Sequence, residues 1–304
     1  MRRFKAALLP LAASLLFSGS FVAAKYVTQE LPPLTATLLR YVVALTFLSM
    51  LSLRSHPLAS RPKLPALLLI ITASLLGIVG YHFFFFLSLR YTLVDNSAII
   101  NALNPAVTAA LAALFLRERL SRANYAGITL ALIGVIILIT KADVQRLAAL
   151  GLNRGDLLML CAAGCWGGYA LIIKRLSVIY SSLKLTLLTS LFGVLLLAPL
   201  SMTENLFQQL GRVSTSSVLW ILYMGIGASG LGYLFYNRSI REMGPTRTAS
   251  VVYSTVPLFV AILSFIIFDE RLTTLMISSA VLIIFGLNLA LRGIAQPATS
   301  SDRS

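Results

Sequence analysis

One arginine stands inside an otherwise apolar stretch of the chain. Arg40 follows Pro33 by seven residues, which places it about 10 Å into a bilayer if the stretch is a membrane helix. An arginine at that depth needs a cavity or a partner, and its planar guanidinium matches a carboxylate through two parallel hydrogen bonds. Arg40 is therefore a candidate anchor for a carboxylate-bearing substrate. The alternative is a structural role, in which it binds helix-end carbonyls or pairs with Glu30 or Asp95.

Further polar and aromatic side chains interrupt the apolar stretches and are candidates to line a path for a polar solute. For each of them a hydrogen bond between helices is the alternative. Pro105 and Pro257 are candidate hinges, because proline removes a backbone donor in mid-helix and bends the helix. An accidental kink is the other interpretation of the two prolines. The candidate lining residues are Ser18, Tyr81, His82, Asn101, Asn104, Trp166, Tyr169, Tyr236 and Tyr253.

The sequence has few titratable side chains that could couple transport to an ion gradient. All ten acidic residues fall in loops or at the ends of apolar stretches, whereas coupled carriers usually need a carboxylate near the middle of the membrane. His82 lies within an apolar stretch and titrates in a range that suits proton coupling. A histidine beside the four phenylalanines 83–86 is more often a hydrogen-bonded packing residue. We therefore expect facilitated diffusion or exchange, with His82 or a membrane-edge acid as the only routes to proton coupling.

The sequence contains no pattern that indicates a catalytic or metal-binding site. Cys161 and Cys165 lie one helical turn apart, but the further Cys and His neighbours of a zinc site are missing, and small apolar packing is the better interpretation. The chain has no HExxH motif, no paired intramembrane aspartates and no Ser/His pair at a plausible depth. We expect no metal, no cofactor and no enzymatic activity.

The composition places these residues in membrane helices. The chain is 58% hydrophobic and 12% charged, whereas soluble domains carry about 25% charged residues. Roughly 20 mostly apolar residues cross a bilayer core. Ten stretches approach that length, and 123–139 and 275–291 are almost purely aliphatic and are expected at the periphery. The ten are residues 6–26, 34–53, 65–87, 94–116, 123–139, 156–173, 183–200, 218–237, 248–268 and 275–291.

The net charge of +15 is a signal of topology and not of nucleic-acid binding. The basic residues sit in loops, and with the N-terminus in the cytoplasm 17 of the 25 lie inside and seven outside, with Arg40 in a span. This excess predicts that both termini are cytoplasmic. The first stretch has the look of a secretory signal, but it aligns with the sixth stretch and is expected to remain as a span.

The chain consists of two related halves. Glu118-Arg119-Leu120 recurs as Glu270-Arg271-Leu272, a register of 152 residues (270 − 118) that also joins Pro105 to Pro257 and Gly80-Tyr81 to Gly232-Tyr233. Upstream the register is 149, as for Gly19 with Gly168, so a three-residue insertion falls near residues 202–217. Five spans per half make the repeats inverted, which suits alternating access. We expect a first repeat at 1–141, a linker at 142–155, a second repeat at 156–293 and a polar tail at 294–304.

These features together resemble the drug/metabolite transporter superfamily, and specifically its EamA-type ten-helix members. The duplicated five-helix unit, the Glu-Arg-Leu ends, the two prolines, Arg40 and Trp166-Gly167 carry the resemblance over nearly the whole chain. Many members have a tryptophan early in the first helix, matching Trp166, where this chain has Phe17. The exchange removes an indole N–H donor and puts a polar role of that aromatic in doubt.

The resemblance implies an all-α inner-membrane exporter of an amino acid or related metabolite, working as a monomer or weak homo-oligomer on a small molecule in the lipid bilayer. The superfamily also carries nucleotide sugars, phosphorylated sugars and drugs, so another cargo is the first alternative. A non-transporting membrane scaffold is a further alternative, and a membrane enzyme is the least favoured.

Overall fold

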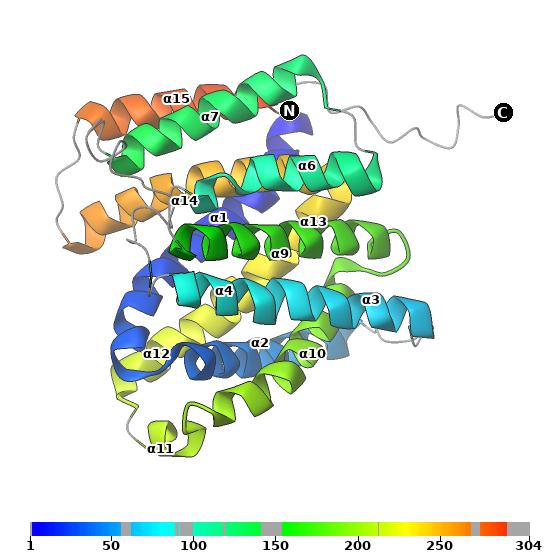
Figure 1. Ribbon diagram of the computed structural model, residues 1–304, viewed down its shortest axis with the longest axis vertical. Helices are drawn as coiled ribbons and strands as arrows, with labels where there is room; N and C mark the ends of the chain where they lie inside the picture. The colour runs from blue at the N-terminus through cyan, green and yellow to red at the C-terminus, as the bar shows by residue number, and fades with distance from the viewer. Residues whose placement is uncertain are drawn as a thin grey trace.

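The computed structural model describes residues 2–55, 62–88, 91, 100–117, 120–140, 154–211, 213–268 and 274–290. All regular elements in these ranges are helices, which confirms the expectation of an all-α membrane protein (Figure 1). They are α1 (Arg2–Glu30), α2 (Pro33–Ser55), α3 (Leu64–Ser74), η1 (Leu75–Gly80), α4 (Tyr81–Ser88), α6 (Asn104–Leu116), α7 (Arg122–Thr140), α9 (Arg154–Leu176), α10 (Ser182–Met202), α11 (Leu206–Leu210), α12 (Thr215–Tyr223), η2 (Met224–Gly232), α13 (Tyr233–Met243), α14 (Pro245–Phe268) and α15 (Thr274–Ala290).

The helices have the length and surface of membrane spans. Five of the described helical segments are long and apolar enough to cross a bilayer: Pro33–Leu53, Leu64–Phe85, Arg154–Leu176, Ser182–Met202 and Thr215–Met243. Large aliphatic side chains stand on the outside of the bundle, such as Leu53 at 77% and Leu114 at 72% exposure. In water such a surface would be unfavourable, and in a bilayer it contacts lipid.

Two of the long helices contain a π-helical segment, η1 in Leu75–Gly80 and η2 in Met224–Gly232. The 152-residue register superimposes the end of η1, Gly80, on the end of η2, Gly232. In both cases a tyrosine follows and starts the next α-helix, α4 or α13. A π segment rotates the helix that follows it and is frequent at functional sites, so these two segments set the direction in which Tyr81 and Tyr233 project.

Pro105 lies in a different local structure from the one predicted. It occupies the first turn of α6, and the chain makes a tight turn just before it, with Leu103 N donating to Ile100 O. The first turn tolerates proline because an N–H there has no partner within the helix. The prediction of proline within a continuous helix over 94–116 is therefore wrong for Pro105, whereas Pro257 does lie inside α14.

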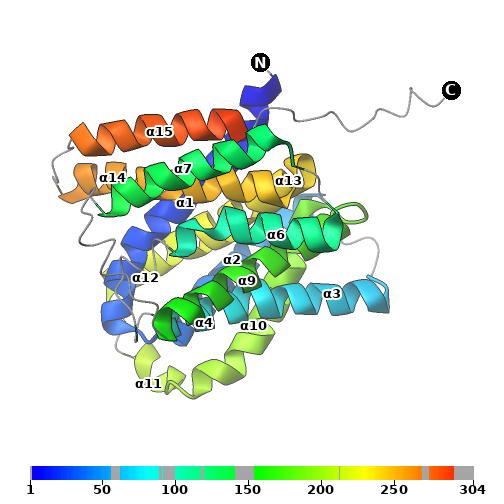
Figure 2. The ribbon, with the colours of Figure 1, turned by 45° about the horizontal axis from the view of Figure 1, so that its top comes forward.

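Small residues bring the helices close enough to build the centre of the bundle. A Cβ on Gly225 of η2 would lie 2.5 Å from Val43 Cβ and 2.9 Å from Arg40 O on α2. At the edge of the bundle, α7 and α15 lie side by side (Figures 1 and 2), and a Cβ on Gly127 would come within 2.6 Å of Gly286 O. Only glycine permits such approaches. The first of these contacts presses Arg40 against η2.

Candidate substrate site

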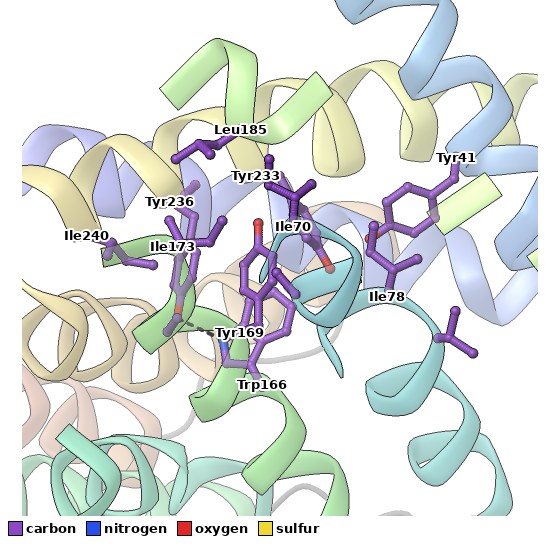
Figure 3. Packing of buried hydrophobic residues seen from close by; sticks show 14 of the residues in the cluster. Tyr41, Ile70, Ile78, Trp166, Tyr169, Ile173, Leu185, Tyr233, Tyr236 and Ile240 are labelled. Carbon is purple, nitrogen blue, oxygen red and sulfur yellow. Dashed lines mark hydrogen bonds between the residues drawn. The ribbon is translucent and has the colours of Figure 1, made fainter. Parts of the chain in front are cut away.

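An aromatic cluster fills the centre of the bundle around Trp166 of α9. The ring centroid of Trp166 lies 5.0 Å from Tyr81, 5.2 Å from Tyr236, 5.4 Å from Tyr233 and 5.5 Å from Tyr169. Figure 3 shows how the last three gather about the indole. Tyr169 and Tyr236 are fully buried, and Trp166 is only 3% exposed. Rings from α4, α9 and α13 therefore form one closed group.

Hydrogen bonds fix the orientation of these rings. Trp166 Nε1 donates to Tyr236 Oη at 2.8 Å, which is the dashed line in Figure 3. Tyr169 Oη donates to Asn237 Oδ1 at 2.9 Å, and Asn237 Nδ2 donates to Thr186 Oγ1 of α10 at 2.9 Å. A buried polar group keeps its position when its partners are satisfied, so this side of the cluster is rigid.

Arg40 borders the cluster from α2. Its Nε donates to Ser229 Oγ of η2 at 2.8 Å, and its guanidinium carbon lies 5.8 Å from the centroid of the Tyr41 ring. The acid partners considered for it do not take that role: Glu30 binds Ser214, and Asp95 lies outside the described residues. Within the described ranges Arg40 has no carboxylate partner. Its charge is held in place by a neutral hydroxyl.

His82 lies between Tyr41, which neighbours Arg40, and Tyr81, which contacts Trp166. Its Nδ1–H donates to Ile78 O at 2.7 Å, and its ring meets Tyr41 and Tyr81 edge-on at 5.9 and 5.2 Å. The side chain is 6% exposed. His82 is therefore hydrogen-bonded and packed between aromatic rings, as expected for a histidine next to four phenylalanines.

Asn101 and Asn104 lie on the side of the cluster nearest α6. Asn104 Nδ2 donates to Asn101 Oδ1 at 2.9 Å, and the Asn101 side chain is within hydrogen-bonding reach of the Tyr81 hydroxyl. Asn104 Oδ1 and Thr108 Oγ1 are fully buried with no hydrogen-bond partner in the described structure. Two unsatisfied acceptors one helical turn apart are unusual in a packed interior and leave a place for a donor.

Ser18 and Tyr253 join the site from its far side. Ser18 Oγ lies 3.1 Å from Val256 O and 2.7 Å from Ser14 O, so it ties α1 to α14 as an ordinary interhelical bond. Tyr253 of α14 meets Trp166 edge-on at 6.4 Å and is 8% exposed. The structure thus brings Arg40, Tyr81, His82, Trp166, Tyr169, Tyr236 and Tyr253 into one group, with Asn101 and Asn104 beside it and Ser18 in the α1–α14 interface.

Sequence reasoning missed three residues of the site: Ser229, Tyr233 and Thr186. Tyr233 was within reach, because the 152-residue register makes it the counterpart of Tyr81. Ser229 lies among the glycines of η2, and only its approach to Arg40 reveals a role. In the sequence Thr186 cannot be told from the many threonines whose hydroxyl donates to a carbonyl of the same helix, and Thr186 Oγ1 does donate to Ser182 O.

A cavity of about 410 Å³ lies between the start of α10 and one side of α13. Its wall combines apolar residues with Arg238, Arg241 and Glu242, and Arg238 and Glu242 form an ion pair at 2.9 Å. Among the described residues there is no group of three or more His, Cys, Asp or Glu side chains that could hold a metal ion. The described residues of the aromatic cluster and its border offer one cation, aromatic faces and amides.

Comparison with known proteins gives the family. The pattern of the EamA-like transporter family matches residues 4–140 and again 153–292. An uncharacterized transporter of Bacillus subtilis, YyaM, is 26% identical over 94% of this chain and 93% of its own length. A Salmonella typhimurium protein named "Probable amino-acid metabolite efflux pump" is 27% identical over 90% of each chain. These proteins are named as transporters and not as enzymes.

A solved crystal structure shares the fold at a TM-score of 0.77 and 21% identity, covering 94% of this chain and 98% of that one. The apolar helices, the resemblance and the two family matches agree with one another. The chain therefore belongs to the EamA-like transporter family of the drug/metabolite transporter superfamily, and it is a multi-pass membrane transporter of a small molecule.

Proposed function

We propose that the chain is a ten-helix carrier of the inner membrane that exports a small carboxylate-bearing metabolite, an amino acid or a derivative of one. It consists of inverted repeats at 1–141 and 156–293, has both termini in the cytoplasm, and works by alternating access as facilitated diffusion or exchange. The matching positions of η1 and η2 and the two separate family matches support the repeats.

The observation that carries the cargo class is the state of Arg40. It lies in the bundle against the aromatic cluster and has no carboxylate partner among the described residues. A guanidinium in a low-dielectric setting gains most from an anion that it binds through two hydrogen bonds. A substrate carboxylate supplies that anion, and the rings of Tyr41, Tyr81 and Trp166 accommodate an apolar side chain beside it.

Counterflow in proteoliposomes tests the proposal. Vesicles are loaded with unlabelled amino acids and other metabolites, and uptake of labelled solute is followed for wild type, Arg40→Ala, Arg40→Lys and the exposed control Arg238→Ala. Charge-assisted hydrogen bonds contribute roughly 1.5–3 kcal/mol, so Arg40→Ala should raise the half-saturation concentration at least about tenfold, with Arg40→Lys intermediate. A half-saturation concentration that Arg40→Ala leaves unchanged would make Arg40 a structural residue.

A further inference from the structure

The N-termini of two helices each bind a carboxylate from the opposite half of the chain, and α12 also has a local cap, because Ser214 Oγ accepts from Ser217 N. The Glu204 carboxylate, which follows α10, accepts from Leu34 N at 3.2 Å, Thr35 N at 2.8 Å and Thr35 Oγ1 at 3.0 Å at the start of α2. The Glu30 carboxylate at the end of α1 accepts from Ser214 N at 3.0 Å and Ser214 Oγ at 2.7 Å at the start of α12. The first amides of a helix need such acceptors and carry a partial positive charge.

Both contacts lie at the same end of the bundle. The end of α1, the start of α12 and α11, which follows Glu204, lie together at the lower left of Figure 1. The charge distribution assigns this end to the outside of the cell. Each contact joins a residue before position 141 to one after position 156, so separating the halves at this end breaks both.

The corresponding positions at the other end carry no such contact. In the 149-residue register Glu30 corresponds to Ile179, and the counterpart of Glu204 falls within residues 52–55, which include no acid. The helices that correspond to α12 and α2 are α3 and α10. The first turn of α3 has no side-chain cap, and that of α10 is capped locally by Ser181, which accepts from Lys184 N. At that end the described side chains that join the halves are donors and not carboxylates: Arg175 Nη2 donates to Phe115 O at 3.0 Å, and Asn124 Nδ2 donates to Ala290 O at 2.6 Å.

We propose that Glu30 and Glu204 are gating residues, which hold the outer end of the transport pathway closed by binding the N-termini of α12 and α2 across the two halves. This inference rests on the proposed alternating-access function. Outer opening must break both carboxylate contacts. Inner opening must instead break the contacts that Arg175 and Asn124 make across the halves with Phe115 O and Ala290 O.

The test measures the outer end directly, without a substrate. Spin labels are placed on cysteines at the exposed positions Gln29 and Gln208, in protein whose Cys161 and Cys165 are replaced by alanine, and the distance distribution is recorded in lipid nanodiscs. Glu30→Gln and Glu204→Gln keep the side-chain shape and remove the charge. Each should raise the ratio of long-distance to short-distance populations about fivefold, and the double variant more.

Glu242→Gln is the matched control, because it removes a carboxylate that pairs with Arg238 on the same helix. Ser214→Ala removes the hydroxyl that donates to Glu30 without altering a charge, and it also removes the cap that Ser214 Oγ gives Ser217 N. A distribution that stays at the wild-type ratio in both glutamate variants, or that shifts as much in Glu242→Gln, overturns the gating role. A shift in the glutamate variants, together with no counterflow of any carboxylate-bearing solute, would leave the gate standing and refute the proposed cargo. Counterflow of such a solute that depends on Arg40, without a shift in the glutamate variants, would refute the gate and leave the cargo standing.

Discussion

At the scale of single residues, two side-chain hydrogen bonds among the described residues orient the site. Arg40 is oriented by Ser229, and Trp166 by Tyr236. Replacing Trp166 by Phe leaves the Tyr236 hydroxyl buried without its donor, so we expect a loss of roughly 1–3 kcal/mol in the free energy of unfolding. Thermal unfolding in detergent measures it. Trp220→Phe is the control, since Trp220 stacks on Tyr26 at 5.4 Å. Equal losses in the two variants would show that the hydrogen bond contributes nothing.

Glu30 adds a pH dependence at the same scale. The backbone amide of Ser214 lowers the pKa of the Glu30 carboxyl below its ordinary value of 4.5, and the hydroxyls of Ser214 and Ser217 lower it further. The contact is therefore complete above pH 4.5 and is lost as the pH falls through the lowered pKa. In a Glu204→Gln background the spin-label distances should lengthen on acidification. Ser214→Ala should weaken this dependence, and an acid-induced change of the same size in Glu30→Gln would rule out Glu30 as its source.

At the scale of elements, the close approach of α2 to η2 decides where Arg40 lies. A methyl group on Gly225 would overlap Val43 and the Arg40 carbonyl, so Gly225→Ala should push α2 away and separate Arg40 from Ser229. We expect a loss of about 1–3 kcal/mol in the free energy of unfolding and weaker substrate binding. Gly164→Ala is the matched control, because a Cβ there meets no atom within 4 Å. Unchanged binding in Gly225→Ala would show that this packing does not position Arg40.

The elements also show what the sequence could and could not predict. Apolar length alone predicts the helices, and the register predicts that Gly80-Tyr81 and Gly232-Tyr233 are equivalent. The π segments before them are not predictable from the sequence. A π segment shifts the positions that follow it around the helix, and this shift can be seen only where a helix has separate polar and apolar faces, which these helices lack. The local start of α6 at Asn104 has a signal in the sequence, because Asn104-Pro105 is a dipeptide that favours the start of a turn.

At the scale of the whole molecule, the aromatic cluster and the outer contacts describe one conformation of a carrier. The cluster is buried, and the outer end is tied across the halves by Glu30 and Glu204. The candidate residues could be chosen from the sequence because polar groups are rare in the spans. Their grouping could not, because partners such as Trp166 and Tyr236 are 70 residues apart, and only the packing of α9 against α13 brings them together.

The central claim is that Arg40 binds the carboxylate of the substrate, and one titration tests it most directly. The chain has two tryptophans, so Trp220→Phe leaves Trp166 as a single fluorescent reporter inside the site. We predict a saturable change of Trp166 fluorescence with an amino acid, none with a matched compound whose carboxylate is replaced by a carboxamide, and none for the amino acid in Arg40→Ala. An equal response to the carboxamide, or one that Arg40→Ala leaves intact, would contradict the account.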